Sequence, residues 1–254
     1  MVRSELRLDG GHLQLILDQP KGNIISRALI GDLRAALAAV PRTSSIRLVT
    51  IEGAGDHFSY GASVEEHQPA HIADVLPALH DLVRELLAVP APTAAIVRGR
   101  CLGGGFEVAL ACDLIFASST AVLGVPEITL GVFPPAATAL LPPKIGSSRA
   151  ASAILTGQAR PVAHWAEAGL VELTAPAEEL KAAVDHWFHT HLAARSAAAL
   201  RCAATATRVG LRKHVDAVLP ELERYYLETL MGTQDAAEGN TAFLEKRAPV
   251  WRHA

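Results

Sequence analysis

Three consecutive glycines, Gly103-Gly104-Gly105, stand where an apolar run ends and a helix-like segment begins. Because no Cβ atoms intervene, a ligand oxygen can approach the backbone N–H groups of such a turn, and the positive end of the helix dipole adds to the field there. This arrangement suits a developing oxyanion. A turn that only lets the helix pack closely on a sheet would have the same sequence. The GxxxxGK[ST] and GxGxxG patterns of nucleotide-binding loops are both absent.

Two isolated acids follow in apolar surroundings, Glu107 in the helix-like segment and Glu127 between Pro126 and Ile128. Glu107 comes three residues after Gly104, so a helix would place its carboxylate on the face of the glycine amides. A buried carboxylate needs a partner or a raised pKa. Two carboxyl groups facing one water can divide the roles of general base and general acid, the minimum for adding water to a double bond. Alternatively, Glu107 is a surface residue that stabilises the helix dipole.

A third segment, His57–Ser63, follows a predicted strand, and its Gly61-Ala62 pair can present one more backbone N–H group. Its serines and histidines do not indicate a nucleophilic triad, because the GxSxG pattern is absent. His67, His71 and His80 have helical spacing, but no metal-binding spacing such as HExxH occurs. We interpret these histidines as a solvated helix face.

The elements that must position these residues alternate between strand and helix in the first two thirds of the chain. Leu6–Leu8 and Leu13–Leu17 flank the turn Asp9-Gly10-Gly11, which predicts a hairpin. Ser26 can cap the first helix. Further strands are expected at 46–51, 93–97 and 114–117, and helices at 72–89 and 106–112. This alternation indicates an α/β fold.

The last third of the chain is mostly helical. After a proline-rich passage around 134–143, apolar periodicity predicts helices at 147–156, 161–168, 177–194, 196–211, 214–231 and 235–247. We place a soft boundary near residue 190, which divides the chain into a core, 1–190, and a helical region, 191–254.

Composition narrows the class of protein further. The chain has 254 residues, half of them hydrophobic, only 5% of them aromatic, and a formal charge of −3, so nucleic acid is not an expected partner. No apolar leader or membrane-spanning stretch is recognisable. The three cysteines form no CxxC pair and fit a reducing cytoplasm, where we expect them to be buried apolar residues. A cytoplasmic protein is therefore expected.

Four segments in register resemble one family over nearly the whole chain: FSYGAS, CLGGGFEVALACD, GVPEITLGV and the tail AFLEKR. Together they are similar to the crotonase (enoyl-CoA hydratase) superfamily. The resemblance implies a spiral of ββα units, here 1–190, followed by a helical trimerisation region, here 191–254, assembled as a trimer or a dimer of trimers. It also implies an acyl-coenzyme A thioester as substrate, with no metal and no further cofactor.

Site residues carry over from this resemblance position by position. The backbone N–H groups of Ala62 and Gly104 would bind the thioester carbonyl oxygen, which becomes enolate-like. Glu107 and Glu127 match the paired hydratase glutamates, and the sequence leaves open which is the base and which the acid. Five positions match contacts to coenzyme A, namely Lys21, Ser63, Val64, Phe243 and Lys246. Phe243 and Lys246 commonly reach it from a neighbouring subunit, although Lys246 could equally be a plain surface charge.

Two departures from the family pattern bear on the acyl group. The aspartate usual after the Gly-Ala pair is Ser63, and a PGAGG stretch is replaced by Phe133-Pro134-Pro135-Ala136-Ala137-Thr138. Both belong to a branch that HFSYGASVEEH and GVFPPAATALLPP resemble, the cyclohexa-1,5-diene-1-carbonyl-CoA hydratases of anaerobic benzoyl-CoA degradation. Replacing glycines by prolines and alanines stiffens the backbone and adds apolar bulk, and a rigid pocket favours a rigid ring.

Other readings remain open at this point. The chain could be an ordinary enoyl-CoA hydratase, or a decarboxylase of a branched enoyl thioester. A different class is a catalytically silent CoA-binding scaffold, against which the retention of Glu107 and Glu127 argues.

We predict that the protein forms a homotrimer or a hexamer. The helical region is too apolar for an isolated appendage and needs a partner surface, and Ala199, Ala203 and Ala206 share one helix face that permits close approach. Light scattering at micromolar concentration measures the assembly, and a monomer would contradict the prediction.

Overall fold

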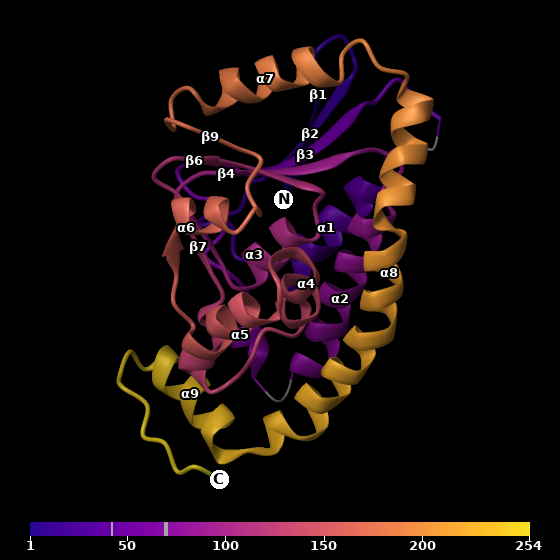
Figure 1. Cartoon of the computed structure of the whole chain (residues 1–254). Helices are drawn as coiled ribbons and strands as arrows, with labels where there is room; N and C mark the ends of the chain where they lie inside the picture. Colours follow the sequence, from indigo (N-terminus) through magenta and orange to yellow (C-terminus); the bar gives the residue numbers. More distant parts are fainter. Residues whose placement is uncertain (42, 69–70) are drawn as a thin grey trace.

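Two β-sheets organise the chain, and the computed structural model describes residues 1–41, 43–68 and 71–254. The larger sheet has the strand order β1-β2-β3-β4-β6-β9 and the smaller sheet the order β5-β7-β8 (Figure 1). The larger sheet is parallel apart from the β1–β2 hairpin, in which Arg7 pairs with His12. The strands are Val2–Arg7, His12–Leu17, Leu48–Gly53, Thr93–Val97, Arg100–Leu102, Leu114–Ser118, Val122–Gly124, Arg160–Pro161 and Leu173–Ala175.

Nine α-helices lie within the described residues: α1 to α9 are Arg27–Ala38, Ile72–Ala88, Gly104–Leu110, Pro135–Ile145, Ser147–Thr156, Val162–Glu167, Leu180–His191, Ala197–Glu228 and Gln234–Leu244. Short 3-10 turns occur at Glu65–His67 (η1), Pro126–Leu130 (η2) and Leu230–Gly232 (η3). The expected cap of α1 is confirmed, because the Ser26 side chain accepts a hydrogen bond from the Leu29 N–H group.

A repeated ββα unit relates the two sheets. In each repeat the first strand joins the larger sheet, the second joins the smaller one, and a helix follows, as in β4-β5-α3 and β6-β7-η2. The unit before these has β3, then Ser59 in a parallel bridge to Cys101 of β5, then α2. The α/β spiral of ββα units expected from the sequence is therefore confirmed.

Both faces of the larger sheet are covered. Helix α7 lies on one face, where Leu180, Val184 and Phe188 pack on Phe116 and Ile96 of the strands (Figure 1). The other face carries the main core, which includes α1, α2 and α3. Double coverage explains the nearly continuous apolar sequence of β4, because parallel strands are buried on both faces.

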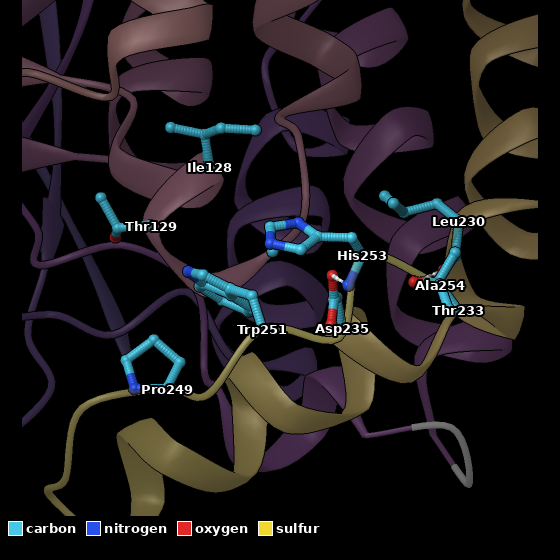
Figure 2. Close-up of a pocket in the computed structure, with 10 residues that line it drawn as sticks. Ile128, Thr129, Leu230, Thr233, Asp235, Pro249, Trp251, His253 and Ala254 are labelled. Atoms are coloured by element: carbon cyan, nitrogen blue, oxygen red, sulfur yellow. Dashed lines mark hydrogen bonds between the residues drawn. The ribbon is translucent and has the colours of Figure 1, made fainter.

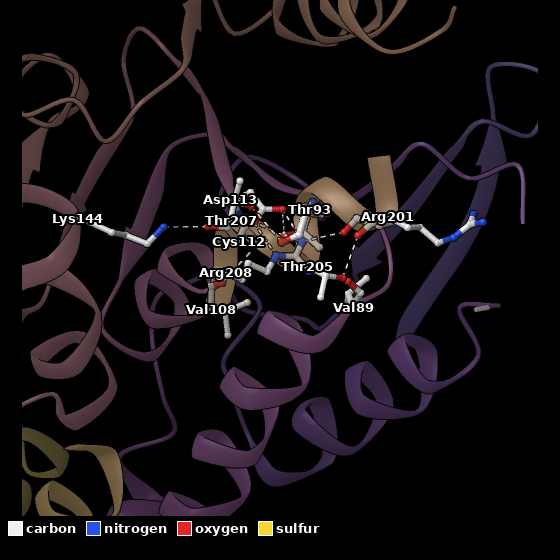
Figure 3. A network of polar contacts seen from close by, with 12 residues as sticks. Val89, Thr93, Val108, Cys112, Asp113, Lys144, Arg201, Thr205, Thr207 and Arg208 are labelled. Carbon is white, nitrogen blue, oxygen red and sulfur yellow. Dashed lines mark hydrogen bonds and ion pairs between the residues drawn. The ribbon is translucent and has the colours of Figure 1, made fainter. Parts of the chain in front are cut away.

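Helix α8 runs along one side of the molecule and packs on α2 and α4 (Figure 1). Its Arg208 is 3% exposed and fixes the helix to the loops around β4 (Figure 3). The guanidinium forms an ion pair with Asp113 and donates hydrogen bonds to the carbonyl oxygens of Val89 (2.6 Å) and Ala91 (2.7 Å). Asp113 in turn accepts from the Thr93 N–H group at 2.8 Å, so one buried network joins α8 to the larger sheet.

Three details differ from the sequence-based expectations. The helices expected at 196–211 and 214–231 form one continuous helix, since buried Arg208 and Val215 anchor it on both sides of Gly210. The proline-rich passage contains α4, whose first residue is Pro135, the position where a helix needs no N–H donor. Cys202 is exposed, unlike the other two cysteines.

No described helix combines the length and the apolar character that crossing a bilayer requires.

We predict that Arg208→Met destabilises the protein by about 3–5 kcal/mol, because it leaves Asp113 partly buried without its cation and strips two carbonyl oxygens of their donor. Urea unfolding at a fixed protomer concentration measures the loss. Arg212→Met, an exposed arginine one turn along α8, is the matched control and should change stability little. Equal effects of the two substitutions would contradict the anchoring role of Arg208.

Candidate active site

Successive units of the spiral bring the predicted site residues to one edge of the smaller sheet. Ala62 follows Ser59, Gly104 opens α3 after β5, and Glu127 lies in η2 after β7. The segments run parallel, with Ser59 paired to Cys101 and β5 paired to β7. Because parallel segments end at the same edge, the sheet places these three residues together although they are far apart in sequence.

The glycines of the turn before α3 make room for two other segments, η2 and residues 59–62. A Cβ atom at Gly103 would lie 2.6 Å from Oε1 of Glu127, and one at Gly105 would lie 2.4 Å from Cβ of Ser59. Gly104 lies against Ala62, and a Cβ atom at Gly104 would lie 3.4 Å from the backbone nitrogen of Ala62. Gly103 also has φ +50° with ψ −129°, a conformation that residues with a side chain rarely adopt. Gly103 and Gly105 are therefore required for close approach, and Gly104 lies near the limit.

The N–H groups of Ala62 and Gly104 were expected to form an oxyanion site, and the backbone pairing around them shows where they are free to donate. Ile25 pairs with the residues on either side of Ala62: its N–H donates to Gly61 O at 2.8 Å, and its carbonyl oxygen accepts from Ser63 N–H at 3.3 Å. This pattern turns the Ala62 N–H away from Ile25. Gly104 is the first residue of α3, whose opening N–H groups have no carbonyl partner within the helix. The two donors can thus serve one oxygen.

Glu107 is buried, with 3% of its surface exposed, and its carboxylate lies at the start of α4. Oε1 accepts a hydrogen bond from the Ala137 N–H group at 2.8 Å. Burial raises the pKa of Glu107, and this is opposed by the Ala137 N–H group, by nearby His80 and by the Ala136 N–H group. The segment that departs from the family pattern therefore supplies the donors that stabilise the Glu107 carboxylate.

Among the described residues, Glu127 receives no such support from another element, and only a hydrogen bond from its own backbone lowers its pKa. Its Oε2 is buried without a hydrogen-bond partner there, and its Oε1 lies over Gly103. Burial raises the pKa of Glu127 well above its ordinary value, and the charge of Glu107 raises it further. The two carboxyl groups thus differ in environment, which favours one protonated and one ionised group in the same site.

Sequence reasoning missed two residues that lie close to this pair. Tyr226 of α8 is buried, and burial and the charges of Glu127 and Glu107 raise the pKa of its hydroxyl. His80 of α2 is 0% exposed, so its interpretation as part of a solvated face is wrong; His67 is partly buried, and His71 is exposed. Helical spacing gave α2 correctly, but which side of α2 is covered depends on α8, more than a hundred residues later. In the described residues no cluster of acids, histidines and cysteines suits a metal ion.

Three of the positions expected to contact coenzyme A flank the Ala62 segment. Lys21 is exposed in the loop after β2, next to Gly22, whose carbonyl oxygen accepts from Tyr60 N–H at 2.9 Å. Ser63 and Val64 follow Ala62 directly and are partly exposed. The structure therefore brings Lys21, Ser63 and Val64 to the neighbourhood of the candidate oxyanion site.

The other two positions lie at the end of α9. Phe243 is 55% exposed and Lys246 is also exposed, just beyond the helix. Helix α9 packs on η2 and also reaches η1 of its own chain, where the Asn240 side-chain amide donates to His67 O at 3.2 Å. The packing is close, since a Cβ atom at Gly239 would lie 2.0 Å from Leu130 O.

A separate groove of about 670 Å³ lies between η2 and the C-terminal tail (Figure 2). Asp235 holds this tail by accepting hydrogen bonds from the N–H groups of Arg252 (2.6 Å) and His253 (2.9 Å). The residues that line the groove include Ile128 and Trp251, but none of the predicted catalytic or oxyanion residues. The groove is thus distinct from the candidate site.

Comparison with known proteins identifies the family and the fold to which the chain belongs. Residues 9–254 match the enoyl-CoA hydratase/isomerase family, so the chain belongs to that family. The structure of an enoyl-CoA hydratase from Mycobacterium avium subsp. paratuberculosis superposes with a TM-score of 0.86, at 28% identity and with 98% of each chain covered. The fold is therefore the crotonase fold.

Relatives define the class more narrowly. The cyclohexa-1,5-dienecarbonyl-CoA hydratase of Thauera aromatica is 44% identical over 248 residues, which cover 98% of this chain and 95% of the relative. The 2,3-dehydroadipyl-CoA hydratase of Escherichia coli is 34% identical, with 94% of each chain covered. The chain is accordingly an enzyme of the hydratase class, a carbon–oxygen lyase.

We predict that Glu107→Gln and Glu127→Gln each lower turnover by at least about 10²-fold, because each removes one proton-transfer group, while binding of the CoA ester largely survives. Steady-state kinetics and titration with a CoA ester separate the two effects. Glu167→Gln, in an exposed position of α6, is the control. Near-normal turnover in either folded variant would remove that residue from the mechanism.

Proposed function

We propose that this enzyme hydrates cyclohexa-1,5-diene-1-carbonyl-CoA to 6-hydroxycyclohex-1-ene-1-carbonyl-CoA. The observation that carries the proposal is the pair of unlike carboxyl groups, Glu107 and Glu127, beside the N–H groups of Ala62 and Gly104. The 44% identity to the Thauera aromatica hydratase supports the choice of acyl group.

In the proposed reaction the thioester oxygen accepts hydrogen bonds from Ala62 and Gly104. Glu107, whose carboxylate is supported by the start of α4, takes a proton from water. The hydroxide adds to C2 of the ring, and the diene electrons move toward the thioester to form a dienolate. Glu127, the more readily protonated acid, gives its proton to C5, which leaves a double bond between C1 and C6. One water is added in total, and no metal or further cofactor takes part.

A rigid wall beside the acids supports a ring as substrate. Ala136 and Ala137 are fully buried in the first turn of α4, directly after Pro134 and Pro135. Phe133 stacks edge-on against Tyr226, with 5.4 Å between the ring centroids. Proline and a helical first turn restrict the backbone, so this wall cannot open for a flexible chain as glycines would permit.

The same proposal includes coenzyme A binding and assembly. Coenzyme A would contact five residues, Lys21, Ser63, Val64, Phe243 and Lys246, the last two from the same or a neighbouring subunit. Region 191–254 would form the interface of a homotrimer or a dimer of trimers. In support, Ala199, Ala203 and Ala206 all lie on the exposed side of α8. The proposed location is the cytoplasm, with neither nucleic acid nor membrane as a partner.

We predict that kcat/KM for cyclohexa-1,5-diene-1-carbonyl-CoA exceeds that for crotonyl-CoA by at least about tenfold, because a rigid apolar pocket discriminates by shape. Purified protein assayed with both thioesters gives the ratio. A preference for crotonyl-CoA would contradict the ring assignment and leave a hydratase of linear enoyl-CoA. Loss of carbon dioxide from a branched enoyl thioester would indicate the decarboxylase alternative, and binding without turnover of any thioester a silent scaffold.

A further inference from the structure

The short turn η2, which carries Glu127, is positioned by the elements around it. It is a 3-10 turn of five residues without a side-chain cap, and such turns have poor hydrogen-bond geometry of their own. Two of its neighbours meet its side chains: Glu127 lies over Gly103, and Cγ2 of Ile128 lies against Gly157 at the end of α5. Another neighbour is α9, and that contact is of a different kind.

Helix α9 meets η2 backbone to backbone. A Cβ atom at Gly239 would overlap the carbonyl group of Leu130, and one at Gly131 would lie 2.7 Å from the carbonyl oxygen of Asp235. Asp235 and Gly239 are one helical turn apart on one face of α9, and they meet the last residue and the cap of η2. Because rotating a side chain cannot relieve a backbone contact, this contact fixes where the turn lies.

Helix α9 also holds the loop that follows Ala62. Asn240, next to Gly239, is 3% exposed, and its side-chain amide donates to His67 O at 3.2 Å. His67 is the last residue of η1, and its Nδ1 lies 2.7 Å from Ser63 O. Two neighbouring residues of α9 thus contact the turn of the acid and the loop that begins beside the expected oxyanion donor.

Helix α9 is itself anchored in the molecule. The Thr233 side chain caps it by accepting from the Ala236 N–H group at 3.1 Å. Ala236 and Ala242 are almost fully buried, and Ala236 belongs to an apolar cluster with Ile72 of α2 and Tyr226 of α8. A support that is fixed to two long helices can hold a short turn in place.

We propose that Gly239 and Asn240 are positioning residues that set the place of Glu127 relative to the Ala62 N–H group. The inference rests on the proposed role of Glu127 as the acid and extends it to the C-terminal helix. Glu127 gives its proton to a carbon of a substrate whose thioester oxygen is bound by Ala62, so the spacing of the two segments decides the rate. A misplacement of about 1 Å at such a site can cost about 10²-fold.

The first test crowds the contact between α9 and η2. In Gly239→Ala the new methyl group presses on Leu130, and η2 yields because its other contacts pass through side chains. We predict that kcat falls about 10- to 100-fold while KM stays within about twofold. Steady-state kinetics with cyclohexa-1,5-diene-1-carbonyl-CoA, or with crotonyl-CoA should the enzyme prefer it, measure both. Gly232→Ala in η3 is the matched control, since a Cβ atom there meets nothing within 4 Å, and it should change neither constant.

The second test asks whether the loss acts through the acid. In the Glu127→Gln background we expect Gly239→Ala to cost less than about twofold, because no acid is left to misplace. A general packing defect would instead lower the residual rate by the same factor again.

A third variant loosens α9 without crowding it. Asn240→Ala removes the hydrogen bond to His67 O and should lower kcat about 3- to 10-fold. Thr241→Ala is its control, because the Thr241 hydroxyl is exposed and bonds only within α9, to Ala237 O, and it should leave kcat unchanged.

Three results would overturn the inference. One is a normal kcat with a raised KM in folded Gly239→Ala, which would mean that α9 moves and η2 does not. Another is an equal loss in the Glu127→Gln background. Should Gly239→Ala fail to fold, Asn240→Ala decides alone, and a normal kcat there is the third. Normal turnover of Glu127→Gln would instead overturn the proposed function, so the two failures are distinguishable.

Discussion

The site depends on three chain segments meeting at Gly103–Gly105, where no side chain keeps them apart. Glu127 lies over Gly103, Ala62 against Gly104 and Ser59 against Gly105, and α3 begins in the middle of the turn. Each contact is closer than a Cβ atom allows or near that limit. The spiral repeat makes the convergence possible, because its second strands end at one edge and deliver one segment per turn. The geometry of the site thus follows from close packing of the backbone and does not depend on polar contacts between side chains.

Once the segments meet, electrostatics separates the roles of two chemically identical acids. Both are removed from water, which disfavours their charged forms. Glu107 recovers part of that cost from the N–H groups at the start of α4, whereas Glu127 has no comparable donor in the described residues and also experiences the charge of Glu107. An ionised base and a protonated acid can therefore coexist a short distance apart. The prolines that replace a glycine-rich stretch matter here, since they fix the turn whose N–H groups hold Glu107.

The fold class and the two acids of the site were predictable from the sequence, because local sequence patterns indicate them. The glycine turn, the two acids in apolar settings and the strand–helix alternation gave the fold and brought attention to Glu107 and Glu127. The short strands β5, β7 and β8 were not predicted, because two or three residues are too few to show periodicity. The burial of His80 was missed for a different reason. It depends on Glu223, 143 positions away, and a pairing over that separation leaves no trace in helical spacing.

Helix α8 connects these observations, since it belongs by sequence to the region proposed for assembly and yet completes the surroundings of the acids. At 32 residues it is about 48 Å long. Arg208 fixes its first half to the loops around β4, while in its second half Glu223 contacts His80 of α2 and Tyr226 lies close to the two acids. One helix therefore contributes both to the anchoring of the larger sheet, through Arg208, and to the surroundings of the two acids, through Tyr226.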